Sequence, residues 1–247
     1  LDLALSAAVA GEPRPKLAAT TTGEIVAFAY VFPVRSRRQR GHRMVLETLW
    51  LTFALTVIIS ARYLVLSGLA YWLLWQRGGE KLKAKRLNRD RPMRAAVRQE
   101  IRLSLISSFV YAVPAAMTTA ALLGGGTRIY TEWNGAADLP YLLFSVLIYL
   151  FVQDAYYYWA HRIMHHPRLF RWMHAGHHRS RQPSPFASFA FDPAEAALTG
   201  WVLPAMAFIV PIHLFAALAL LSLMSVVAVL NHAGWEVLPR RFLVGSV

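Results

Sequence analysis

The chain has 247 residues, of which 56% are hydrophobic and 16% are charged, whereas soluble domains carry about 25% charged residues, so a water-soluble globule is disfavoured. The 26 lysines and arginines outnumber the 13 acidic residues, but they alternate with long apolar runs, which is typical of a membrane protein and argues against a nucleic-acid-binding one. There is no cysteine, which excludes disulfides, thiolate metal sites and cysteine nucleophiles.

Residues 1–43 differ from the rest of the chain. They contain no methionine, mix small and polar residues, and end in an arginine-rich run that also holds His42. Met44 then opens directly onto an apolar stretch. We therefore interpret 1–43 as an N-terminal extension that is disordered or not native. We interpret 44–247 as one membrane domain, C-terminally incomplete, because the chain stops without a closing polar segment.

Five apolar segments follow in chain order. A helix needs about 20 mostly apolar residues to cross a bilayer. The first two segments meet this length, the third continues without a breaker to His166, and the last two are shorter arms separated by Pro211. The segments are Leu49–Trp75, Leu105–Leu123, Leu139–Val152, Ala196–Val210 and Ile212–Leu230. They predict an all-α, polytopic membrane bundle of four to five apolar segments.

The basic residues between these segments predict the orientation. Ten lysines and arginines lie between Arg77 and Arg102, five arginines lie in 161–181, and only one lies in 124–140. Positive loops stay on the cytoplasmic side, so we expect the histidine-rich segment to face the cytoplasm, at a bacterial inner membrane or an ER-type membrane. If the chain turns back at Pro211, His232 returns to that side and His213 lies at the opposite one.

Six of the nine histidines fall within eighteen residues, in the two clusters His-x-x-x-His-His and His-x-x-His-His. Residues three or four apart share a helix face, so each cluster can grip a metal ion. Pro167 is expected to end the first helix and turn the second cluster toward the first. His166 points about 140° away from His161 on a helix. The predicted metal ligands are His161, His165, His166, His174, His177, His178 and, through the hairpin, His232.

Asp154 lies seven residues before His161 and shares its helix face. A metal-bound imidazole commonly donates its second N–H to a carboxylate. Asp154 is therefore predicted either to accept such a hydrogen bond or to bind the metal directly. The alternative is an acid paired with a neighbouring arginine.

The type of ligand limits the metal. Imidazole-rich sites suit zinc, copper, iron or nickel. Structural zinc takes four ligands, and more histidines than that are available here. The surplus favours two metal ions and, with dioxygen chemistry, two irons.

Together these motifs resemble the fatty acid hydroxylase/sterol desaturase superfamily of membrane-bound di-iron oxygenases, over roughly Met44–Val247. The resemblance implies a membrane bundle with a histidine-rich cap on the cytosolic side, two irons held by the histidines named above, and a further His-x-x-His-His box downstream. This chain lacks that box, so we expect it to be a fragment. The matching stretches are Asp154–His165, His174–His178, Pro185–Glu195 and Asn231–Glu236.

The same resemblance implies an activity. Members hydroxylate or desaturate a lipid of sterol or fatty-acyl type, using dioxygen and an external electron donor, here a ferredoxin or a b-type cytochrome. The alternative is a non-catalytic or degenerate metal-binding membrane protein. The arginine-rich loop 77–102 could hold anionic lipid head groups, dock an acidic electron donor, or serve topology alone.

Overall fold

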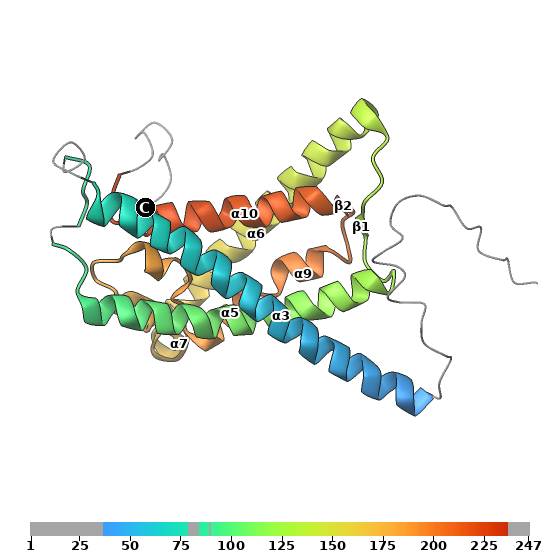
Figure 1. The fold of residues 1–247 in the computed structure, drawn as a ribbon, viewed down its shortest axis with the longest axis horizontal. Coiled ribbons are helices and arrows are strands. Elements are labelled where there is room, and N and C mark those ends of the chain that lie inside the picture. Colours follow the sequence, from blue (N-terminus) through green and yellow to red (C-terminus); the bar gives the residue numbers. More distant parts are fainter. Residues whose placement is uncertain (1–36, 79–83, 89, 237–247) are drawn as a thin grey trace, which may run out of the picture. The chain divides into compact units, whose positions relative to one another are not determined.

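The computed structural model describes residues 37–78, 84–88 and 90–236, with side chains from Val45 onward. Two compact units are distinguished, Leu1–His42 and Arg43–Val247, and element labels follow Figure 1. The first unit contributes only the start of one helix to the described residues. The predicted extension 1–43, with the side chain of His42, therefore lies largely outside them.

Four helices of the described residues are long and apolar enough to cross a membrane. The helices are α3 (Arg37–Tyr71), α5 (Arg94–Leu123), α6 (Leu139–Met164) and α10 (Leu214–Asn231) (Figure 1). They contain most of the predicted segments, but α3 and α5 begin more than ten residues earlier and α6 continues to Met164, because the polar residues there extend the helix. This confirms the expected all-α membrane bundle.

The faces of these helices divide large apolar side chains from small polar ones. Trp50, Phe151 and Phe215 are each more than 65% exposed, as suits side chains that meet lipid rather than water. The buried positions hold small hydroxyl side chains instead, which let neighbouring helices approach closely. Fully buried serines are Ser67, Ser104, Ser107, Ser108 and Ser145.

Short elements connect and fill the spaces between the long helices. The 3₁₀ turn η5 (Pro185–Phe189) contacts α5 and α10, and α8 (Pro193–Thr199) contacts α5, α6 and α7. These two elements therefore bring the loop after the second histidine cluster into the bundle. The remaining short elements are η2 (Trp72–Gln76), η3 (Gly135–Asp138), α7 (Pro167–Met173), η4 (His177–Arg179) and α9 (Val202–Met206).

The segment predicted as a fourth span, Ala196–Val210, is not a single helix. It is divided between α8 and α9, which have 7 and 5 residues and are too short to cross a bilayer. At the break, a Cβ on Gly200 would lie 2.7 Å from the Tyr111 ring, so this position packs tightly against α5. Met206 and Ala207 are buried whereas Phe208 and Ile209 are exposed, so the segment lies partly inside the bundle and partly on its surface.

Two strands of two residues close the end of the bundle that lies away from the histidine clusters. β1 (Ile129–Tyr130) pairs in parallel with β2 (Ile212–His213), with Ile129 opposite Ile212. His213 then caps α10, because its Nδ1 accepts a hydrogen bond from the backbone N–H of Phe215. The 18 residues of α10 are about 27 Å long, which separates the His213 end of the helix from the His232 end.

Hydroxyl groups on α3 and α5 hold the segment that follows the second histidine cluster. Tyr63 and Ser104 both donate to the backbone carbonyl of Phe186, at 2.9 and 3.1 Å, and Ser107 donates to the carbonyl of Phe191 at 3.0 Å. The buried carboxylate of Glu100 accepts hydrogen bonds from Ser180 and Ser184. Two membrane helices thus position this loop through its backbone.

Candidate metal centre

The first histidine cluster ends one helix, and a proline begins the next. α6 ends at Met164, and His166 has extended backbone angles, φ −61° and ψ 133°. Pro167 occupies the first position of α7, where its missing N–H costs nothing. The chain therefore turns between the two clusters, as predicted from Pro167.

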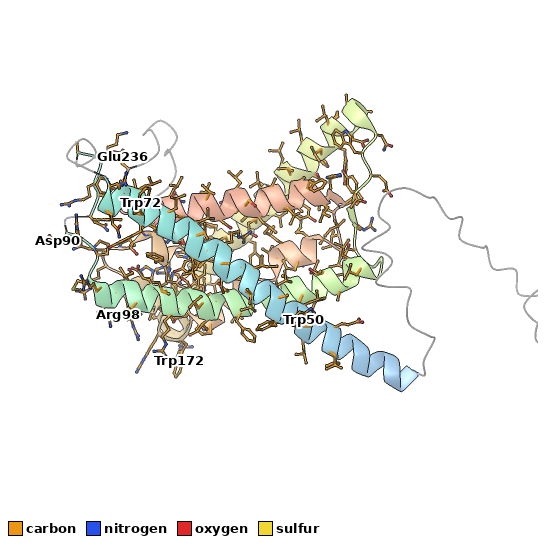
Figure 2. All side chains as sticks on the ribbon, viewed as in Figure 1. Trp50, Trp72, Asp90, Arg98, Trp172 and Glu236 are labelled. Carbon is orange, nitrogen blue, oxygen red and sulfur yellow. The ribbon has the colours of Figure 1, made fainter. Side chains whose placement is uncertain are left out.

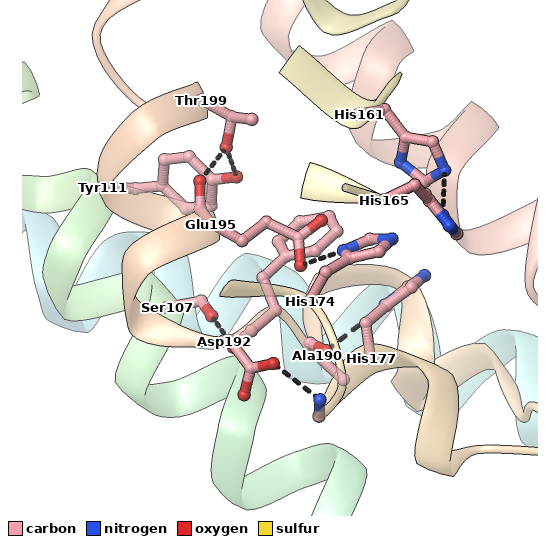
Figure 3. Close-up of polar contacts among 12 residues, drawn as sticks. Ser107, Tyr111, His161, His165, His174, His177, Ala190, Asp192, Glu195 and Thr199 are labelled. Atoms are coloured by element: carbon pink, nitrogen blue, oxygen red, sulfur yellow. Dashed lines mark hydrogen bonds and ion pairs between the residues drawn. The ribbon is translucent and has the colours of Figure 1, made fainter. Parts of the chain in front are cut away.

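Three histidines from the two clusters lie against one another (Figure 3). The ring centroids of His161 and His174 are 4.5 Å apart, those of His161 and His165 are 4.7 Å apart, and those of His165 and His174 are 5.0 Å apart. One ligand nitrogen of each lies within 4.8 Å of the others. These three residues form the centre of the cluster.

Three further histidines extend the cluster. The ring of His178 lies 4.7 Å from that of His174, and the ring of His177 lies 5.3 Å from it. His232, the residue that ends α10, places its ring 5.5 Å from His177. The chain does return after Pro211, and His232 lies at the histidine end of the bundle.

Local hydrogen bonds orient the rings through Nδ1. The Nδ1 of His174 lies 2.8 Å from Oε2 of Glu195, and both side chains are fully buried. His177 Nδ1 lies 3.3 Å from the carbonyl oxygen of Ala190, and His232 Nδ1 lies 2.8 Å from that of Ala228. With Nδ1 engaged, Nε2 is the nitrogen left for a metal, an arrangement common among ligating histidines.

Unpaired nitrogens inside the cluster show that these residues fit a metal ion. His174 Nε2 and His161 Nδ1 are buried and have no hydrogen-bond partner among the described residues, whereas buried polar atoms are normally paired. The Nε2 atoms of His161 and His165 are 3.1 Å apart. Two imidazoles bound about 2 Å from one ion would place their nitrogens about 3 Å apart, so little movement is needed.

Burial keeps the imidazoles in the form that binds metal. It lowers the pKa of His177 to about 3, helped by the neighbouring His232 and His174 rings. Burial likewise lowers the pKa of His174, His178 and His232. A neutral imidazole offers a lone pair, and metal binding requires this deprotonated state.

The carboxylate partner of the cluster is Glu195, which sequence reasoning did not single out. Burial, followed by the charge of Asp192, raises the pKa of Glu195 to about 8. α8 fixes its backbone, because Thr199 donates to the Glu195 carbonyl at 2.8 Å and Tyr111 bonds Thr199 (Figure 3). An acid inside the apolar run 193–210 is the signal that could have identified it, since a buried acid in a membrane protein marks a function.

Two predicted site residues are exposed. Asp154 is exposed on α6, and the carboxylate that contacts a cluster histidine is that of Glu195, so the role of Asp154 stays a prediction. His166 is also exposed, and its Nδ1 accepts a 3.4 Å hydrogen bond from the backbone N–H of Arg168 at the start of α7. Helical spacing places Asp154 on the same face of α6 as His161, but the bundle does not cover that part of the face.

Gly176, between His174 and His177, is a position where a side chain cannot be accommodated. Its N–H donates to Asp192 Oδ2 at 2.6 Å, and a Cβ there would lie 2.1 Å from Asp192 Oδ1. We expect Gly176→Ala to break this hydrogen bond and lower the free energy of unfolding by about 2 kcal/mol, measured by thermal unfolding in detergent. Gly68→Ala is the control, because a Cβ added there would have no atom within 4 Å; no loss is expected there.

Comparisons with known proteins bear on the same residues. The fatty acid hydroxylase family profile matches residues 146–246. Lathosterol oxidase of Rattus norvegicus is 31% identical over 157 residues, 61% of this chain and 52% of that protein. Lathosterol oxidase of Homo sapiens is 33% identical over 144 residues, 56% of this chain and 46% of that protein.

A Delta(7)-sterol 5(6)-desaturase of Leptosphaeria maculans is 24% identical over 172 residues, 70% of this chain and 46% of that protein. The chain thus spans about half the length of the curated relatives it matches. No solved structure matches it. The matched region includes both histidine clusters and His232. Over these residues the chain is similar to fatty acid hydroxylases and sterol desaturases, which supports the resemblance found in the sequence.

Proposed function

We propose that this protein is an oxidoreductase of the membrane, a di-iron oxygenase that hydroxylates or desaturates a lipid of sterol or fatty-acyl type. The single observation that carries the proposal is the convergence of six histidine rings from four chain segments at one end of an apolar helix bundle. Two buried nitrogens of this cluster have no hydrogen-bond partner among the described residues.

The donor set supports two metal ions. His161, His165 and His174 offer three nitrogens close enough for one ion. His177, His178 and His232 offer three more beside them: His178 contacts His165 and His174, and His232 contacts His177. Imidazole donors suit iron, and bound iron would supply the site at which dioxygen is activated with electrons from an external donor.

The residues of this chain have three roles in such an enzyme. Glu195 and the carbonyls of Ala190 and Ala228 hold the rings in position. Tyr157 stacks on His161, with ring centroids 5.8 Å apart, and covers it on the bundle side. The loop 184–191 fills the space between α5 and α10 and keeps water from the buried rings.

The relatives support a lipid substrate, because their names are those of a lathosterol oxidase and a sterol desaturase. Hydroxylation would consume dioxygen, two electrons and two protons to give an alcohol and one water. Desaturation would consume the same and give a double bond and two waters. Either reaction needs an external electron donor, for which a ferredoxin or a b-type cytochrome is suitable, and the basic loops favour a cytoplasmic site by the positive-inside rule.

Metal analysis combined with product analysis tests the proposal. The full protein, purified in detergent, is expected to hold two irons per chain. With a reductant and labelled dioxygen it is expected to add one labelled oxygen to a sterol or fatty-acyl lipid, or to remove two hydrogens from it, as seen by mass spectrometry. Chelation should abolish the product, and added ferrous iron should restore it.

The degenerate metal-binding protein is the alternative outcome. Bound zinc, or no metal, in protein that unfolds cooperatively would contradict the oxygenase. Iron without any lipid product, across sterols and fatty acyl lipids supplied with dioxygen and reductant, would favour a non-catalytic homologue.

A further inference from the structure

A second polar site lies on the surface of the bundle, outside the histidine cluster. It is a hollow of about 510 Å³ between α5 and Arg179 at the end of η4. Figure 2 labels Arg98, one of its residues, at the N-terminal end of α5. The lining residues are Arg98, Gln99, Arg102, Leu103, Ile106 and Arg179.

The order of residues along α5 separates charge from apolar surface. Arg98, Arg102 and Ile106 are spaced four residues apart and share one face of the helix. The arginines occupy its first turns, and Leu103 and Ile106 follow toward the membrane-spanning part. An occupant of this hollow would therefore meet cations at one end and hydrocarbon at the other.

No carboxylate of the described residues neutralises the positive charge of the hollow. Arg98, Arg102 and Arg179 are exposed, and none has an ion-pair partner among the residues that the structure describes. Glu100, the acid closest in sequence, is turned away and buried, where it accepts hydrogen bonds from Ser180 and Ser184. The hollow is thus complementary to an anion.

We propose that this hollow binds the phosphate head group of an acidic phospholipid, with the acyl chains along Leu103 and Ile106. Guanidinium groups bind phosphate through paired N–H donors, and basic side chains next to a membrane helix attract anionic lipid. An acidic protein partner would explain the arginines but not the apolar wall that continues into the span.

Arg179 links this site to the histidine cluster. It follows His178 directly in the sequence, and Ser180 after it is bonded to Glu100. A head group that engages Arg98, Arg102 and Arg179 together would therefore hold the 177–181 segment against α5. The lipid is expected to stabilise the end of the bundle that carries the histidines.

Thermal unfolding of the full protein in detergent, with added phosphatidylglycerol or phosphatidylcholine, tests the site. Phosphatidylglycerol is expected to raise the melting temperature of the wild type, and native mass spectrometry should detect the retained lipid. The double variant Arg98→Gln/Arg102→Gln should bind phosphatidylglycerol on the order of thirtyfold more weakly. The matched control Arg91→Gln/Arg94→Gln removes the same charge from exposed positions outside the hollow and should bind like the wild type.

The remaining arms separate other occupants. Equal weakening in both double variants would overturn the proposal, because general surface charge would then suffice. Equal protection by inorganic phosphate at the same concentration would assign the hollow to a free anion and overturn it too. The proposal would also be overturned if Arg98→Gln/Arg102→Gln bound lipid like the wild type but no longer coupled to an acidic electron donor. If that variant melts early in phosphatidylcholine, the single change Arg179→Gln replaces it, and its unchanged lipid binding would contradict the site.

Discussion

Replacing His174 by alanine is expected to remove nearly all bound iron and to lower lipid oxidation by more than a hundredfold. His174 is fully buried, and its ring contacts those of His161, His165, His177 and His178. His174 would therefore lie between the histidines proposed for one metal ion and those proposed for the other. Because even residues that only orient a metal ligand are worth about 10–100-fold, loss of the central ligand should cost more. Iron content and product yield measure the effect.

Variants of two further histidines distinguish iron lost with a ligand from iron lost through unfolding. His165→Ala removes an exposed ring of the cluster and should also lose iron, without the cavity that a buried change creates. His213→Ala removes a buried histidine at the opposite end of α10, which should cost about 1 kcal/mol as a lost helix cap but leave the iron bound. Iron loss in His213→Ala equal to that in His174→Ala would contradict the assignment of the cluster.

His166→Ala addresses the seventh histidine. Its ring is exposed and bonded to the backbone of α7, so its removal should leave the iron content unchanged. A loss of one iron would return His166 to the ligand set.

Replacing Glu195 by leucine is expected to weaken metal binding by about 10–100-fold, the usual effect of removing the acceptor behind a ligating histidine. The carboxylate lies 2.8 Å from His174 Nδ1, and both side chains are fully buried. Glu195→Gln keeps an oxygen that can accept the His174 N–H but cannot ionise when a metal ion binds nearby, so an intermediate affinity is expected. Competition with a chelator measures the affinity, and the melting temperature of the metal-free protein shows whether folding has changed.

Asp154→Asn is the matched control for this series, because it neutralises an acid on the same helix as His161 but at an exposed position. Its metal affinity should equal that of the wild type. If Asp154→Asn lost metal and Glu195→Leu did not, Asp154 would be the acid that supports the metal site, as its spacing predicts. The role assigned to Glu195 would then be wrong.

The features that follow from local pattern are predictable from the sequence. The apolar runs around Leu105–Leu123 and Leu139–Val152 form helices. An apolar segment that spans a bilayer must pair its backbone polar groups within the protein, and a helix does so within the segment. Helical spacing places His161 with His165, and Pro167 ends the helix between the clusters. The position of His232 depends on the chain turning back at Pro211, which the short length of each arm indicates.

The features that depend on long-range packing are not predictable in this way. Hydrophobicity alone does not distinguish one continuous membrane helix from two short helices packed against the bundle, so the pattern of Ala196–Val210 wrongly predicts a span. Glu195 meets His174 across 21 residues. The carbonyls of Ala190 and Ala228 orient two rings through the backbone, which leaves no side-chain signal in the sequence.

The backbone attachment of the loop 184–191 has a consequence for how freely its side chains can vary. The hydroxyl groups of Tyr63, Ser104 and Ser107 donate to main-chain oxygens of this loop. The rings of Phe186 and Phe189 pack against other rings, that of Tyr63 among them, so we expect other apolar side chains there to leave these hydrogen bonds intact. Evolution or design could thus alter the apolar surface of the loop while its backbone keeps its place beside the histidine cluster.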